Sequence, residues 1–179
     1  SINSRNELNS NKDEIVKKVK SIGEYGILFN DAYSDGINYE NIVGALAEFE
    51  KAILSIDSPF DEYLAGNDDS INAEAKKGFE LFNKVGCVAC HNGRNLGGNL
   101  MQNVGLKDAS ESRRLMRVPS LRNVARTAPY LSSGEMSDLK EVIGFVSYHQ
   151  LIHTLSSEEL GQIYKFLLTL NGRRPRILN

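Results

Sequence analysis

The sequence has few of the residues that define several classes of protein. It has no tryptophan, 4 prolines and only 2 cysteines, and aromatic residues make up 8% of it. Two cysteines in 179 residues exclude a disulfide-stapled scaffold. No apolar run approaches the roughly 18 residues of a membrane-spanning helix, so no membrane partner is expected. A net charge of −2 gives no sign of a nucleic-acid-binding surface, so no nucleic-acid partner is expected either.

The remaining composition, 41% hydrophobic and 25% charged, is ordinary for a globular protein and suits one domain with its own core. The polar first residues, 1–14, lack the pattern of a signal peptide, so the chain is expected to be cytosolic or trimmed.

Apolar residues recur at helical spacing along most of the chain, and no strand alternation is visible. The stretch 92–137 is rich in Gly, Asn, Ser and Arg, and such long loops are usually functional or disordered. The pattern therefore predicts an all-α fold. Helices are expected over about 14–27, 39–53, 73–85, 137–151 and 156–170, with a turn or two in 58–66.

Both cysteines lie in one five-residue motif, Cys87-Val88-Ala89-Cys90-His91. Cys-x-x-Cys-His is the attachment sequence for c-type haem. The two thiols form thioethers to the two vinyl groups, and the histidine that follows binds the iron as its proximal ligand. The motif therefore predicts one covalent haem c per chain and a c-type cytochrome domain over 71–179, with 1–70 as a helical segment packed on it in one compact unit.

Three other interpretations compete with haem attachment. A zinc site needs four ligands, and the chain has only 2 cysteines and 3 histidines. A thioredoxin-like redox pair needs a strand before it, whereas a helix is expected before Cys87. The third is that the motif occurs by chance.

The long loop after His91 is suited to wrapping a haem and supplying arginines to its propionates. The candidates are Arg94, Arg117 and Arg122, and each could equally be a solvated surface residue. The sixth ligand of the iron stays open at this point. The candidates are His149, His153, Met101, Met116 and Met136.

Four segments closely resemble the bacterial di-haem cytochrome c peroxidases. They are EFEKAILSIDSPFDEYLAGND at 48–68, GCVACHNGRNLGGNLMQNVGL at 86–106, RVPSLRNVARTAPYLSSG at 117–134 and DLKEVIGFVSYHQLIHTLSSEELGQIYKFLLTLNG at 138–172. The resemblance covers nearly the whole chain, and it matches the C-terminal, high-potential haem domain of that family. No second Cys-x-x-Cys-His is present, so the N-terminal haem domain is expected to be missing. Glu7 matches a family glutamate implicated in peroxide cleavage, which makes it a candidate catalytic residue.

The resemblance also shows two departures from the family. The family's axial methionine falls at Val146, which cannot bind iron. The iron is then five-coordinate, or bound by His149 three residues on, or bound by a loop methionine, and an open or rearranged site is slightly favoured. Leu131 and Ser132 replace a Phe and a His in a loop that rearranges when the family's enzymes are activated.

The resemblance implies a periplasmic enzyme that reduces hydrogen peroxide to water with electrons from a small cytochrome c or cupredoxin. It also implies a Ca²⁺ site to which the carbonyls of Thr127 and Pro129 contribute, expected to be weak or empty here. Family members are usually homodimers, and the sequence leaves open whether this chain dimerises. The alternative is a free-standing mono-haem electron-transfer cytochrome c.

Overall fold

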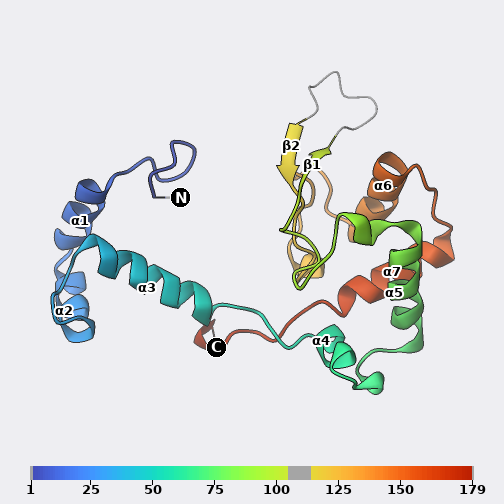
Figure 1. The fold of residues 1–179 in the computed structure, drawn as a ribbon, viewed down its shortest axis with the longest axis horizontal. Coiled ribbons are helices and arrows are strands. Elements are labelled where there is room, and N and C mark those ends of the chain that lie inside the picture. The colour runs from blue at the N-terminus through green and yellow to red at the C-terminus, as the bar shows by residue number, and fades with distance from the viewer. Residues whose placement is uncertain (1, 105–113, 179) are drawn as a thin grey trace. The chain divides into compact units, whose positions relative to one another are not determined.

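The computed structural model describes residues 2–104 and 114–178, which divide into two compact units. Unit 1 runs to Leu54 and includes the chain from Pro175 onward, and unit 2 spans Ser55–Arg174. Helices dominate both units (Figure 1), so the prediction of an all-α fold is confirmed. Within the described ranges, no helix is long and apolar enough to cross a bilayer. The elements are α1 (Lys12–Lys20), α2 (Gly23–Ala32), α3 (Tyr39–Ala52), α4 (Pro59–Leu64), α5 (Ala73–Val85), β1 (Met101–Val104), β2 (Arg114–Arg117), α6 (Leu139–Leu151) and α7 (Ser157–Leu168).

Unit 1 contains the first three helices. The single apolar stripe expected over 14–27 forms two helices, because the chain turns out of helical geometry at Ile22, where φ is −100° and ψ is 104°. The helix expected over 39–53 is confirmed as α3, which Asn38 caps by accepting the Asn41 N–H at 2.8 Å. The predicted division of the chain into 1–70 and 71–179 stays a prediction.

The core of unit 2 lies where α5 packs against α7. The rings of Phe82 on α5 and Phe166 on α7 are 5.2 Å apart between centroids, and Phe166 is fully buried. The helix backbones approach closely at Gly78 of α5. A Cβ atom there would lie 2.5 Å from the carbonyl carbon of Gln162 on α7, closer than Cβ atoms are found in real structures. Gly78 therefore permits the crossing on which the aromatic core depends.

The boundaries of these two helices follow their capping residues. Asn72 caps α5 by accepting the Ala75 N–H at 2.9 Å, and Gly86 ends it in the left-handed region at φ 102°. Ser156 and Glu159 form a capping box at the start of α7, where the helix over 156–170 was expected. The end of α5 is what places the Cys-x-x-Cys-His motif, because the motif begins at the next residue.

The stretch expected to be irregular contains a short antiparallel hairpin, in which Met101 pairs with Arg117 and Asn103 with Leu115. The expectation of no strands was therefore wrong at this place. Each strand has four residues, and MQNV and RLMR show no clean alternation of apolar and polar side chains. The intervening residues 105–113 lie outside the described part of the chain.

Candidate functional site

The cysteine motif folds as one tight turn directly after α5. Residues Cys87–Ala89 form a 3₁₀ turn, and the Cys87 carbonyl accepts the N–H groups of Cys90 at 3.2 Å and His91 at 2.9 Å. Both cysteines are half-buried free thiols. Burial raises the pKa of the Cys87 thiol to about 11, so it stays protonated at neutral pH. A redox-active pair depends on a lowered thiol pKa, so this environment disfavours the thioredoxin-like interpretation.

Zinc is disfavoured as well. Among the described residues, no group of three or more His, Cys, Asp or Glu side chains is arranged to hold a metal ion. A structural zinc site closes with four such ligands.

The His91 ring is held in one orientation by backbone carbonyls. Its Nδ1 lies 3.2 Å from the Leu96 carbonyl oxygen. Burial lowers the pKa of His91, although hydrogen bonding to the carbonyls of Leu96 and Pro119 acts in the opposite direction, so the ring is neutral at pH 7. A neutral ring that donates from Nδ1 carries its lone pair on Nε2, which is the state that binds a metal.

The residues present therefore fit a c-type haem. The turn supplies two thiols and an imidazole with a fixed tautomer, and Phe82 packs against His91 with ring centroids 6.5 Å apart. The fit rests on the donor set and on the orientation of His91.

The loop that holds His91 is built from two segments in close contact, 93–98 and 118–122. Leu96 is buried and adopts φ 44°, and Gly97 adopts φ 132°. A Cβ atom on Gly97 would lie 2.8 Å from the Pro119 carbonyl carbon and closer still to its oxygen, so only glycine fits. The Leu121 N–H donates to the Leu96 carbonyl at 3.2 Å, and the Gly98 N–H donates to the Val118 carbonyl at 2.7 Å.

The three arginines expected as candidates for the haem propionates have different surroundings, and Arg94 is exposed. Arg117 is exposed, and its Nη1 donates to the Gly98 carbonyl at 2.7 Å. Arg122 is largely buried, with 17% of its side chain exposed, and pairs with Asp61 at 2.7 Å. Its three nitrogens also donate to the Ser58 hydroxyl and the Arg94 carbonyl. A propionate role for each of the three stays a prediction, and the contacts of Arg122 favour holding the loop.

The histidine candidates for the sixth ligand lie on α6 or just after it. Val146 and His149 are half-buried, and the His149 ring packs on Phe145 with centroids 4.3 Å apart. In the described part of the chain, the buried His149 Nδ1 and His153 Nε2 have no hydrogen-bond partner. The backbone of His153 is fixed to Ser147, whose hydroxyl donates to the His153 carbonyl at 2.7 Å. The geometry leaves both histidines as candidates and selects neither.

The methionine candidates differ in exposure. Met101 is 49% exposed on β1, whereas Met116 on β2 and Met136 are half-buried. Met136 is fixed by its backbone, because its carbonyl accepts the Tyr130 N–H at 2.6 Å.

The predicted calcium and catalytic residues lie elsewhere. Thr127 and Pro129 are exposed, and their sequence neighbours Ala128 and Tyr130 line a cavity of about 360 Å³ together with Asp138. Glu7 is an exposed residue of unit 1, in the turn before α1. The roles of Thr127, Pro129 and Glu7 stay predictions.

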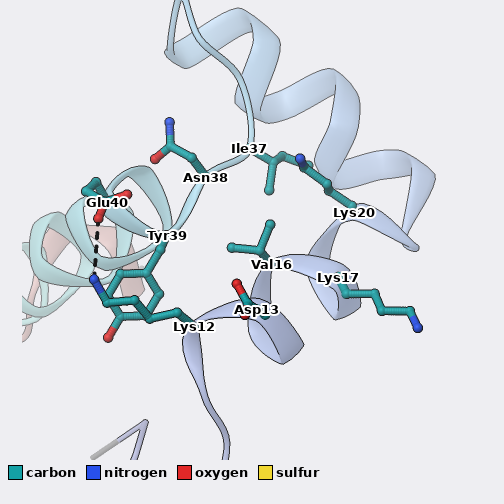
Figure 2. Close-up of a pocket in the computed structure, with 9 residues that line it drawn as sticks. All are labelled: Lys12, Asp13, Val16, Lys17, Lys20, Ile37, Asn38, Tyr39 and Glu40. Carbon is teal, nitrogen blue, oxygen red and sulfur yellow. Dashed lines mark ion pairs between the residues drawn. The ribbon is translucent and has the colours of Figure 1, made fainter.

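A larger cavity of about 550 Å³ lies in unit 1, between α1 and the start of α3 (Figure 2). Its lining mixes charges of both signs, and the Lys12 ammonium lies 3.7 Å from the Glu40 carboxylate. The lining contains neither cysteine nor histidine, so this cavity lacks the chemistry of the Cys-x-x-Cys-His turn. The lining residues are Lys12, Asp13, Val16, Lys17, Lys20, Ile37, Asn38, Tyr39 and Glu40.

Sequence reasoning missed the groups that orient His91. The carbonyls of Leu96 and Pro119 are backbone atoms, which leave no residue-type signature. No local sequence signal distinguishes Asp61 from other acidic residues at the start of a short helix, because its partner Arg122 lies 61 positions away in the sequence. The close approach of Gly97 to the Pro119 carbonyl was not predictable either, because no sequence signal distinguishes Gly97 from the other glycines of the loop.

Comparison with known proteins agrees with this site. A family model described as di-haem cytochrome c peroxidase matches residues 1–69. Cytochrome c peroxidase of Escherichia coli (strain K12) is 36% identical over 179 aligned residues, covering 89% of this chain and 38% of that protein. Cytochrome c551 peroxidase of Pseudomonas aeruginosa is 34% identical, covering 96% of this chain and 56% of that protein. The chain thus spans about half or less of the length of these curated relatives.

A solved structure shares the fold. The crystal structure of a MauG-like protein associated with microbial copper homeostasis matches with a TM-score of 0.72 and 25% identity, covering 91% of this chain and 63% of that one. The family model covers residues 1–69, the relatives cover most of the chain, and together they imply haem c as the cofactor. The chain belongs to the di-haem cytochrome c peroxidase family.

Proposed function

We propose that this chain is a haem c domain of a periplasmic cytochrome c peroxidase, which relays electrons from a small redox protein for the reduction of hydrogen peroxide to water. The observation that carries the proposal is the His91 geometry, in which Nδ1 is paired with the Leu96 carbonyl at 3.2 Å. A neutral His91 that donates from Nδ1 carries its lone pair on Nε2, and one motif with two free thiols supports one haem per chain.

The residues of the chain have separate tasks in this proposal. Cys87 and Cys90 would hold the haem through thioethers to its two vinyl groups, and His91 would bind its iron. The bound haem supplies a one-electron couple at its iron. Arg117 is exposed and donates to the Gly98 carbonyl of the loop 93–98. Its guanidinium would bind a propionate by a charge-assisted hydrogen bond.

The distal side decides which chemistry this domain can perform. Val146 offers no donor atom, and the orphaned, buried Nδ1 of His149 makes that residue the alternative ligand. We favour an open or rearranged distal side, because the His149 ring packs on its helix neighbours Phe145 and Tyr148. An open side admits peroxide, whereas a closed side restricts the domain to electron transfer.

The remaining assignments rest on the resemblance. We propose that the exposed carbonyls of Thr127 and Pro129 contribute to a weak Ca²⁺ site and that Glu7 serves peroxide cleavage beside a second haem. A small cytochrome c or cupredoxin is the proposed electron donor, and a homodimer is the proposed assembly.

The proposal is tested on the haem-bearing chain, produced by export together with the haem-attachment machinery. The chain is reduced by a small donor protein and then mixed with hydrogen peroxide, and the visible spectrum is followed. Because an open distal side would let this haem react with peroxide directly, reoxidation at a rate proportional to peroxide is expected even without a second haem. The matched control is Val146→Met, which introduces a thioether into the distal side and is expected to slow reoxidation while leaving reduction by the donor unchanged. A chain that exchanges electrons with neither partner contradicts the proposal.

The second candidate is a mono-haem electron carrier, which the single Cys-x-x-Cys-His favours. The same experiment separates the two functions. A carrier exchanges electrons with the donor and stays reduced in peroxide, and Val146→Met then changes neither rate.

A further inference from the structure

We propose that the Asp61–Arg122 ion pair is a positioning device for His91 and thereby sets the reduction potential of the haem. The inference rests on the proposed function, because it requires His91 to be the proximal ligand. Both residues act through the backbone of the loop 93–98, so they are positioning residues.

The first link between the ion pair and His91 is that Asp61 holds Arg122 against α4. Asp61 accepts the N–H and the hydroxyl of Ser58 at 2.9 and 2.7 Å, which closes the capping box of this helix. The same carboxylate accepts from Arg122 Nη1 at 2.9 Å and lies 2.7 Å from Nη2. A paired, two-nitrogen contact of this kind fixes the plane of the guanidinium as well as its position.

The second link joins the guanidinium to the loop. Arg122 donates to the Arg94 carbonyl from Nε at 3.0 Å and from Nη2 at 2.7 Å. Ser120 donates to the next carbonyl, that of Asn95, at 2.7 Å. Two successive carbonyls of the loop are thus held by side chains from one segment, 120–122, and Asp61 fixes one of those side chains in turn.

The third link is the Leu96 carbonyl itself. Leu96 adopts φ 44°, a left-handed conformation that a leucine keeps only when its surroundings enforce it. The enforcing contacts are its buried side chain, the Leu96 N–H to Gly93 carbonyl bond at 3.0 Å, and the Leu121 N–H. This conformation directs the Leu96 carbonyl at His91 Nδ1.

The consequence for the haem follows from the basicity of the imidazole. A strong bond from Nδ1–H to a carbonyl makes the ring a more electron-rich ligand and stabilises the ferric state. Loosening the loop weakens that bond and raises the reduction potential. The Leu121 contact remains in a variant of Arg122, so we expect a twofold to tenfold shift of the ferric–ferrous equilibrium, up to about 59 mV.

The test is Arg122→Lys in the haem-bearing chain. It keeps the charge and hence the long-range field at the iron, but it removes the planar fork that reaches Asp61 and Arg94 together. The matched control is Arg173→Lys, because Arg173 also pairs with α4, through Glu62 at 3.2 Å, and its hydrogen bonds within the described residues go to Ser55, Ile56 and Glu62 and not to the loop. The midpoint potential, the hyperfine-shifted proton resonances of the His91 ring and the unfolding temperature are measured for each protein.

A raised potential and moved His91 resonances in Arg122→Lys alone would support the inference. A lower unfolding temperature with an unchanged potential would overturn it, because the pair would then be structural only. An equal shift in Arg173→Lys would also overturn it. If Arg122→Lys fails to fold, the same three measurements are made on Ser120→Ala, which removes the hydrogen bond to the Asn95 carbonyl. A raised potential would again support the inference, and an unchanged potential would overturn it. Failure of the wild-type chain to take up haem would instead refute the proposed function, so the two failures are distinguishable.

Discussion

The crossing of α5 and α7 gives a prediction in which two physical effects have opposite signs. Alanine forms helix better than glycine by about 1 kcal/mol per residue, so Gly78→Ala in the middle of α5 would stabilise the protein on propensity alone. The structure predicts the opposite. The new Cβ atom would lie 2.5 Å from the Gln162 carbonyl carbon, and the obstacle is backbone that no rotamer change can move.

The magnitude follows from the separation that the clash imposes. Ordinary carbon contacts begin near 3.5 Å, so the helices must part by roughly 1 Å at this point. A gap of about 0.5–1 Å forfeits a quarter to a half of each dispersion contact, here across the buried rings of Phe82 and Phe166. Overpacking of this kind costs about 1–3 kcal/mol, occasionally more, which exceeds the propensity gain. We expect Gly78→Ala to lose about 2 kcal/mol, or about 4–8 °C in unfolding temperature.

The matched control is Gly161→Ala on the partner helix. Gly161 has no atom within 4 Å of the added Cβ, so only propensity acts and a gain of up to about 1 kcal/mol is expected. Both variants are unfolded in urea, with helical circular dichroism and haem absorbance followed together, and midpoints are compared at equal m-values. A Gly78→Ala protein as stable as wild type would refute the close crossing of α5 and α7.

Three further predictions concern the loop, acid stability and a helix cap. Gly97→Ala clashes with the Pro119 carbonyl and is expected to lower haem incorporation, measured as the ratio of haem absorbance to protein. Partial burial raises the pKa of Asp61, but hydrogen bonds donated to the carboxylate outweigh this and hold it below its usual value. Asp61 therefore stabilises the fold above its unfolded pKa of about 3.9 and loses that contribution as pH falls through the lower folded value, so Asp61→Asn should flatten the acid side of the stability–pH curve. Ser156→Ala removes the cap of α7 and should cost about 1 kcal/mol in urea unfolding, and no change would contradict the capping box.

Local signals in the sequence were enough for the helices that begin and end at strong capping residues. Asn72 and Gly86 bound α5 at the expected limits of 73–85, and Ser156 caps α7, because a cap acts within one turn of its own position. The break at Ile22 was not predictable in the same way, since the apolar stripe continues through it. The hairpin was missed because strands this short depend on cross-strand pairing between distant residues.

The candidate site shows the same contrast between local signals, which the sequence carries, and contacts between distant residues, which it does not. The motif located Cys87, Cys90 and His91, because haem attachment requires those residue types at that spacing. The Leu96 carbonyl that orients His91 is a backbone atom, and the Asp61 carboxylate that holds Arg122 comes from a helix far away in the sequence. Such contacts exist only once the chain has folded, so spacing alone could not indicate them.

The central claim is that this chain carries one haem covalently on Cys87 and Cys90, with His91 as its ligand. The direct measurement is the mass of the denatured protein after export with the haem-attachment machinery, for wild type and for the Cys87→Ala, Cys90→Ala double variant. The account predicts a wild-type mass increased by one haem that survives denaturation, and no increase in the double variant. A wild-type chain that leaves the same machinery without haem, or a double variant that retains it through denaturation, would contradict the account.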